Sequence, residues 1–142
     1  MLKGIPKNIG SRLLKAMMDM GHGDTLVIAD NFYPAISKTP NGRVCEAKGD
    51  SVTSILDSIL QLMPLDTDYC DYPVKVISPA EYQFKPEIWV EIEQILNRHE
   101  PNAKIRYIGR EEFYKHAREC FVTVSTGEER LFGCVIIQKG VI

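Results

Sequence analysis

The stretch Met20–Asp30 reads MGHGDTLVIAD, and its second half decides the fold. Leu26–Ala29 is a short apolar run with the length and composition of a buried β-strand, and polar residues stand at both of its ends. His22 lies between two glycines ahead of the strand, which leaves space around its imidazole for a ligand. His22 is therefore the first candidate for a catalytic residue. Asp30, which directly follows the strand, is the second candidate for the site.

The residues ahead of the strand also fit two plainer descriptions. The sequence Gly21-His22-Gly23-Asp24 is typical of a helix end followed by a tight turn, in which His22 would be an idle surface residue. A histidine and an aspartate two positions apart could also begin a metal site, but the sequence has no second compact cluster of ligating residues to complete it. The pattern alone leaves open whether these residues act in chemistry or only form a turn.

The composition of the chain bounds the class of protein. It has 142 residues, of which 44% are hydrophobic and 25% charged, and its formal net charge is −2. These values are typical of a soluble globular protein and predict a single domain over residues 1–142. Lysines and arginines are scattered, so we expect no nucleic-acid partner. The apolar runs are much shorter than the ~20 residues of a membrane span, so we expect no membrane association.

The four cysteines, Cys45, Cys70, Cys120 and Cys134, lie far apart and form no Cys-x-x-Cys motif. The sequence does not begin with the pattern of a secretory signal peptide. A chain of this length can be stabilised by its hydrophobic core without disulfides. We therefore expect reduced thiols and a cytoplasmic location.

Hydrophobic periodicity outlines the remaining elements. Apolar residues at helical spacing predict helices over 10–20, 52–63, 86–99 and 110–117, and short apolar runs predict further strands over 43–47, 74–77, 104–108, 121–125 and 135–138. Ser11 and Ser51 are the expected N-caps, and Pro86 is the expected first residue of its helix. An irregular passage is expected over 79–85. His99 and His116 fall on predicted helices among charged neighbours and are expected at the surface.

Two loop segments are also informative. Residues 30–42 are rich in Pro, Asn, Gly and Ser and directly follow the first strand, and long loops in such places often serve as functional walls or lids. The acidic segment 65–73 contains Asp66, Asp68 and Asp71 together with two tyrosines. It fits either a solvated loop or the lining of a polar pocket.

Strands that alternate with helices predict right-handed crossovers and a three-layer α/β/α fold with a mostly parallel, Rossmann-like sheet. The last two strands are expected to form a C-terminal antiparallel hairpin. In such sheets ligands bind at the carboxyl ends of the strands, where Asp30 and Arg110 both fall. Arg110 is unfavourably placed in the first turn of a helix, which a ligand oxygen or a carboxylate partner would explain. A solvated arginine is the alternative.

Several common motifs are absent from the sequence. No Gly-x-Gly-x-x-Gly follows a strand, and neither Gly-x-x-x-x-Gly-Lys-Ser/Thr nor Gly-x-Ser-x-Gly occurs. Nucleotide binding and serine hydrolysis on a nucleophile elbow therefore have no support from motifs.

A set of short motifs instead covers the whole chain in a fixed order. These are MGHGD at 20–24, Ala29-Asp30, LMPLDT at 62–67, Phe113-Tyr114-x-x-Ala117, TGE at 126–128 and KGV at 139–141. Their order and spacing resemble those of the D-ribose pyranase and L-fucose mutarotase family. The MGHGD form and the Phe-Tyr pair are more similar to the fucose branch of that family.

The resemblance implies an isomerase that exchanges the α and β anomers of a free monosaccharide, without cofactor or metal. It implies that His22 is the proton donor, that Asp30 binds the sugar, and that Arg110 is the arginine of the fucose branch. It also implies a ring-shaped homo-oligomer, a pentamer or a decamer of two stacked pentamers, with each site near a subunit boundary.

The closing segment of the family's site reads Tyr-Gly-Asn, and this chain has Phe132-Gly133-Cys134 in that place. Gly133 keeps its backbone hydrogen-bonding groups and Phe132 can stack on a sugar face, so the three positions remain candidates for substrate binding. The phenol hydroxyl and the side-chain amide are absent, which could leave sugar hydroxyls unpaired at roughly 1 to 3 kcal/mol each.

The chemistry can also be argued from the residues. Opening a cyclic hemiacetal requires a proton delivered to the ring oxygen and another removed from the anomeric hydroxyl. A histidine that titrates near neutral pH can perform either transfer and contribute about 10²- to 10⁴-fold. We expect His22 and Asp30 to face each other across the mouth of the sheet, with Arg110 donating hydrogen bonds to the sugar.

The expected activity is therefore anomer exchange on a monosaccharide, with L-fucose as the leading substrate. Two alternatives remain: a non-catalytic sugar-binding or transport-accessory protein, and a mutarotase or pyranase for another sugar such as D-ribose.

Overall fold

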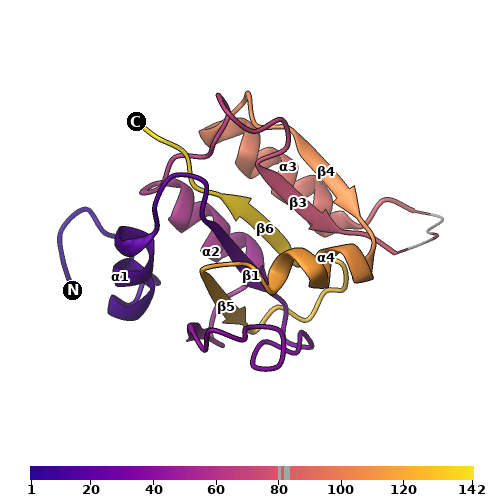
Figure 1. Ribbon diagram of the computed structural model, residues 1–142, viewed down its shortest axis with the longest axis horizontal. Helices are drawn as coiled ribbons and strands as arrows, with labels where there is room; N and C mark the ends of the chain where they lie inside the picture. Colours follow the sequence, from indigo (N-terminus) through magenta and orange to yellow (C-terminus); the bar gives the residue numbers. More distant parts are fainter. Residues whose placement is uncertain (80, 82–83) are drawn as a thin grey trace.

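The computed structural model describes residues 1–79, 81 and 84–142. Of the irregular passage expected over 79–85, residues 80, 82 and 83 lie outside the described residues. The helices in the described residues are α1 (Ser11–Asp19), α2 (Val52–Leu60), α3 (Glu87–His99) and α4 (Arg110–Ala117) (Figure 1). The strands are β1 (Thr25–Ala29), β2 (Val44–Ala47), β3 (Val74–Ile77), β4 (Ile105–Ile108), β5 (Val122–Thr126) and β6 (Val135–Gln138).

The strands form one mixed sheet in the order β2-β5-β1-β6-β3-β4. The β2, β5 and β1 strands are parallel to one another, as are β3 and β4, and β6 lies antiparallel between β1 and β3. The mostly parallel α/β class is therefore confirmed. The expected C-terminal hairpin is wrong in its pairing: β6 is antiparallel, but its neighbours are β1 and β3 and not β5. Because β2 and β1 already pair with both edges of β5, that strand has no free edge for a hairpin.

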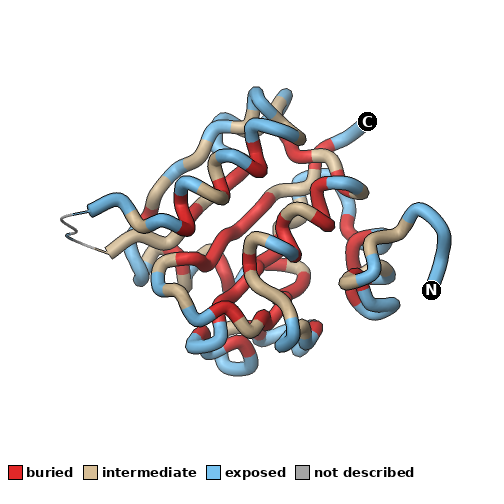
Figure 2. Tube along the Cα trace, turned by 180° about the vertical axis from the view of Figure 1, so that it is seen from behind, coloured by how far each residue is buried: buried red, intermediate tan, exposed pale blue. Residues whose placement is uncertain are grey.

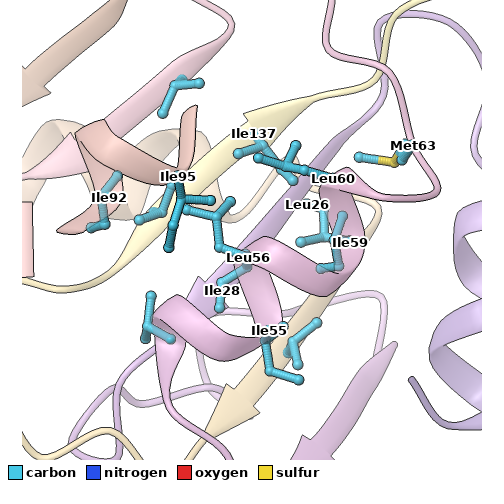
Figure 3. Packing of buried hydrophobic residues seen from close by; sticks show 14 of the residues in the cluster. Leu26, Ile28, Ile55, Leu56, Ile59, Leu60, Met63, Ile92, Ile95 and Ile137 are labelled. Carbon is cyan, nitrogen blue, oxygen red and sulfur yellow. The ribbon is translucent and has the colours of Figure 1, made fainter. Parts of the chain in front are cut away.

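A hydrophobic core lies on each face of the sheet, which confirms the three layers. Successive residues of β1 point to opposite faces, and because both faces are covered the run Leu26–Ala29 is buried throughout (Figure 2). The first core lies between the sheet and α1, α2 and α3, and includes Leu26, Ile28, Ile55, Leu56, Ile59, Ile92 and Ile137 (Figure 3). The second lies beneath α4 and the 30–42 loop, and includes Val27, Ala29, Tyr33, Phe113 and Ile136.

The helix starts agree only in part with the sequence analysis. The Oγ of Ser51 accepts a hydrogen bond from the Ser54 N–H at 3.1 Å, which confirms Ser51 as the N-cap of α2. Ser11 is not an N-cap but the first residue of α1, and Gly10 occupies the cap position. Pro86 caps α3, which begins one residue later at Glu87. The four cysteines form no disulfide. Among the described residues, no helix is both long enough and apolar enough to cross a bilayer.

Candidate active site

The β1 strand separates the two leading site residues. His22 precedes the strand and Asp30 follows it, and five residues rising about 3.3 Å each put roughly 16 Å between the two ends. The carboxyl edge of the parallel strands carries Asp30 and Arg110. Because β6 runs in the opposite direction, Phe132–Cys134 also lie at this edge. His22 lies at the amino edge. The expectation that His22 and Asp30 face each other within one chain is therefore wrong.

The carboxylate that His22 does face is Asp66. The Nε2 of His22 lies 3.0 Å from the Oδ2 of Asp66, and the side chain of His22 is 40% exposed whereas that of Asp66 is 3% exposed. The same Oδ2 accepts a hydrogen bond from Gln138 Nε2 at 3.0 Å, and the Oδ1 accepts one from the Tyr69 N–H at 3.2 Å. The Tyr69 ring also makes an edge contact with the imidazole, at 5.1 Å between ring centroids. Asp66 is thus a buried carboxylate that contacts the exposed His22 ring and is held by two further hydrogen bonds.

The turn that carries His22 is fixed by its backbone. Gly23 has a φ of 88°, a conformation that favours glycine, and its N–H donates to the Lys139 carbonyl at 2.9 Å. The Gly21 N–H donates to Asp24 Oδ2 at 2.7 Å. The expected tight turn is therefore present, and the His22 side chain within it contacts the Asp66 carboxylate.

This arrangement is suited to proton transfer. When the imidazole N–H on Nε2 donates to Asp66, the Nδ1 of the neutral ring is left as the proton acceptor. A buried aspartate that fixes the tautomer of a histidine and stabilises its cation has the same role in hydrolase triads. Asp66 was not predicted to be a site residue. Its position within LMPLDT and within the acidic 65–73 segment was the available signal.

Asp30, at the other edge, is buried, with 8% of its surface exposed. Burial raises the pKa of its carboxyl group, and this effect exceeds the opposing effect of the Phe32 N–H, which donates to Asp30 Oδ1 at 3.0 Å. The nearby charge of Glu128 raises the pKa further. The backbone N–H of Asp30 donates to the Sγ of Cys134 at 3.3 Å. Asp30 is therefore a rigidly held carboxyl group with an elevated proton affinity.

Arg110 is the first residue of α4, as the sequence predicts. Its Nε donates to the Tyr114 hydroxyl at 3.2 Å, and its guanidinium lies 5.2 Å from the centre of that ring. Tyr114 in turn makes an edge contact with Tyr33, at 5.6 Å between centroids. The structure thus joins Arg110, through two aromatic rings, to the loop that follows Asp30.

The three residues Phe132-Gly133-Cys134 have different environments. Phe132 has a φ of 64°, is half-buried, and accepts a hydrogen bond on its carbonyl from Trp89 Nε1 at 2.7 Å. Gly133 packs so closely that an added Cβ would lie 2.5 Å from Ile88 Cδ1. The Cys134 side chain is 2% exposed and belongs to the second core, where burial raises the pKa of its thiol. Of these side chains, that of Phe132 is the one at the surface.

The other two histidines are partly exposed, and each contacts a carboxylate. His99 Nε2 lies 2.7 Å from Asp57, and His116 Nε2 lies 3.6 Å from Glu112. In the described part of the chain, no group of three or more His, Cys, Asp or Glu residues is arranged to hold a metal ion.

The fold and these two polar edges define a small α/β protein with acid–base groups at opposite ends of one sheet. The chain belongs to the RbsD / FucU transport protein family, which it matches over residues 3–142. It is 38% identical to the human fucose mutarotase over 146 residues, covering 99% of this chain and 94% of that protein.

Two solved structures are similar to this one over 99% of both chains. The fucose mutarotase of Streptococcus pneumoniae, solved in complex with L-fucose, has a TM-score of 0.92 and 38% identity. The FucU protein of Bifidobacterium longum has a TM-score of 0.92 and 35% identity.

Proposed function

We propose that this protein is an L-fucose mutarotase, an isomerase that exchanges the α and β anomers of the free sugar. The observation that carries the proposal is the His22–Asp66 pair, an exposed imidazole on a buried carboxylate. Such a pair supplies the acid–base group that ring opening requires. The family of the chain, and the fucose mutarotases among its relatives, support L-fucose as the substrate.

The proposed reaction transfers protons without redox chemistry. Protonated His22 donates a proton to the ring oxygen while the anomeric hydroxyl gives its own proton to solvent water, and the bond between the anomeric carbon and the ring oxygen breaks to give the open aldehyde. Rotation about the adjacent carbon–carbon bond presents the other face of the aldehyde. The same steps in reverse then close the ring as the other anomer. In this proposal Asp30 accepts hydrogen bonds from sugar hydroxyls, Arg110 donates them, and Phe132 stacks on the apolar face of the sugar.

The proposed site is shared between subunits. A separation of roughly 16 Å along β1 prevents one chain from bringing both His22 and Asp30 to a single pyranose ring. We therefore propose that His22 of one subunit meets Asp30 of the next in a ring-shaped homo-oligomer, a pentamer or decamer. Reduced thiols and a free-sugar substrate support a cytoplasmic location.

One observation favours a second candidate function, sugar binding without turnover. Phe132 has no hydroxyl and the Cys134 thiol is covered, so the segment offers a sugar fewer polar side-chain groups than Tyr-Gly-Asn would. The same departure bears on the identity of the sugar, and D-ribose is the alternative substrate.

The test is saturation-transfer NMR on L-fucose, and in parallel on D-ribose, at anomeric equilibrium. The proposal expects exchange between the α and β signals of L-fucose that rises with protein concentration and disappears in His22→Ala. His116→Ala is the matched control, because it removes a partly exposed histidine that also contacts a carboxylate, and it should exchange like the natural protein. Binding without exchange would support the second candidate and refute the first.

The shared site has its own test. Light scattering should give a large multiple of the 16.1 kDa subunit mass, and a monomer at micromolar concentration would refute the ring. Co-expression of His22→Ala with Asp30→Ala chains should restore part of the exchange activity, since some boundaries in mixed rings carry both natural residues. No recovery in mixed rings would refute a site that His22 of one subunit shares with Asp30 of the next.

A further inference from the structure

The segment 127–134 between β5 and β6 is tied to α3 by Arg130. The Nε and Nη2 of Arg130 donate to the two carboxylate oxygens of Glu128 at 3.1 and 3.0 Å, the two-point geometry that arginine favours. Its Nη1 donates to Glu91 of α3. Each guanidinium nitrogen thus already has a carboxylate partner, so Arg130 is better placed to hold the segment than to bind a sugar.

The 127–134 segment that Arg130 holds is hydrogen-bonded to Asp30 and to its neighbour Asn31. The Glu128 carbonyl accepts a hydrogen bond from the Asn31 N–H at 2.8 Å, at one end of the segment. Cys134, at the other end, accepts one from the Asp30 N–H. Between them stands Phe132 with a φ of 64°, a conformation that is uncommon for a bulky residue and is kept only where the neighbours impose it.

Arg130 also sets the charge beside Asp30. The Glu128 carboxylate is only 6% exposed, and Arg130 holds its pKa below the ordinary value although burial alone would raise it. The charge of Glu128 contributes to the raised pKa of Asp30. The other titratable and charged groups around Asp30 are Tyr33 of the same loop, Cys134 at the end of the 127–134 segment, and Lys48, whose Nζ lies 3.0 Å from the Oδ1 of Asn31.

We propose that Arg130 is a positioning residue for substrate binding: with Glu128 and Glu91 it holds the Phe132 segment against Asp30. The inference rests on the proposed function, in which Phe132 and Asp30 contact the sugar. Arg130 therefore acts on binding through these two residues, and it takes no part in proton transfer.

The test compares Arg130→Gln with Arg130→Lys in the intact oligomer. Arg130→Gln should raise the KM for L-fucose about tenfold and leave kcat within about twofold of the natural value, since only binding is affected. It should also move the acidic limb of the kcat/KM profile to higher pH, because Glu128 loses its cation and raises the pKa of Asp30 further. Arg130→Lys keeps the charge but loses the fork, so it should leave the acidic limb in place and raise the KM by a smaller factor.

Arg98→Gln is the matched control. Arg98 pairs with Asp57 between α3 and α2, is 64% exposed, and should have natural kinetics when replaced. A folded Arg130→Gln variant with natural KM and pH profile would overturn the inference, as would a loss of kcat alone. If Arg130→Gln does not fold, a natural KM in Arg130→Lys would overturn it.

A second readout does not depend on activity. Trp89 is the single tryptophan of the chain, is 1% exposed, and donates from its indole to the Phe132 carbonyl. Release of the segment should expose the indole to water and shift its emission to the red in Arg130→Gln, but not in Arg98→Gln. If the natural protein exchanges no anomers, the proposed function fails, and this emission still decides whether Arg130 holds the segment. An unchanged emission would then refute the positioning role.

Discussion

Gly140 is the position where one added methyl group should disturb the acid–base pair most. A Cβ built on Gly140 would lie 2.4 Å from the carbonyl oxygen of Leu65, 2.6 Å from its carbonyl carbon and 2.8 Å from the Cα of Asp66. Ordinary contacts begin at 3.4 Å, so Gly140 and the Leu65–Asp66 backbone must separate by 3.4 − 2.4 = 1.0 Å to restore one. That backbone carries the carboxylate that holds His22.

The displacement should lower both the stability of the protein and the rate of anomer exchange. Overpacking of this kind destabilises a protein by about 1 to 3 kcal/mol. For a domain of this size that corresponds to a fall in Tm of roughly 3 to 10 °C. A shift of about 1 Å in a group that positions a catalytic residue lowers the rate about 10²-fold. Gly140→Ala should therefore lose far more activity than its loss of stability explains.

The assay pairs anomer exchange, measured by saturation-transfer NMR, with thermal unfolding. Gly49→Ala is the control, because a Cβ there meets nothing within 4 Å. Its expected effect is a gain of up to about 1 kcal/mol through the unfolded state, with natural activity. A Gly140→Ala variant with natural Tm and exchange rate would refute the reasoning, and so would equal losses in both variants.

Three further predictions concern stability. The Tyr33 hydroxyl is buried and has no hydrogen-bond partner among residues 1–79, 81 and 84–142, so Tyr33→Phe should leave the free energy of unfolding in urea unchanged or raise it by about 1 kcal/mol; a loss of about 1 kcal/mol would contradict this. Burial raises the pKa of Asp30 above its ordinary 3.8, so protonation of Asp30 stabilises the folded state. This contribution to stability is fully present below pH 3.8 and is lost as the pH rises through the folded pKa. Asp30→Asn should consequently raise Tm at pH 7 but not at pH 3, while weakening sugar binding; a lower Tm at pH 7 would count against it. Arg130 lowers the pKa of Glu128 below its ordinary 4.5. The ion pair between Glu128 and Arg130 therefore stabilises the fold above pH 4.5, and this stabilisation is lost as the pH falls through the folded pKa of Glu128. The Tm deficit of Glu128→Gln should therefore shrink below pH 4.5, and a deficit independent of pH would exclude the ion pair as its cause.

The elements of this fold could be predicted from the sequence because their signals are local. The run Leu26–Ala29 and the helical spacing of Ile55, Leu56 and Ile59 each identify an element within a few residues, and the structure confirms them. The alternation of strands with helices then restricts the topology to a mostly parallel sheet. Asp30 and Arg110 were correctly placed at the carboxyl edge for the same reason.

The pairing of β6 and the partner of His22 could not be predicted in this way, because both depend on long-range contacts. The hairpin was expected because residues 126–129 have the composition of a turn between the last two strands, but strand neighbours are decided by which edges remain free. Asp66 lies 44 positions from His22, and its place in the LMPLDT motif separates it from Asp68 and Asp71 without indicating that it contacts His22. Its burial and its three donors appear only once Gln138, on β6, lies beside it.

The central place of β6 has a consequence for synthesis of the chain. The strands β1, β2 and β5 form one group and β3 and β4 another, and β6 is the strand that joins them. Residues 135–138 leave the ribosome after the other five strands of the sheet, so neither group can complete its hydrogen bonding before they emerge. Nascent chains should expose two unpaired strand edges up to that point, which favours late, cooperative closure and makes truncation before Val135 a route to aggregation.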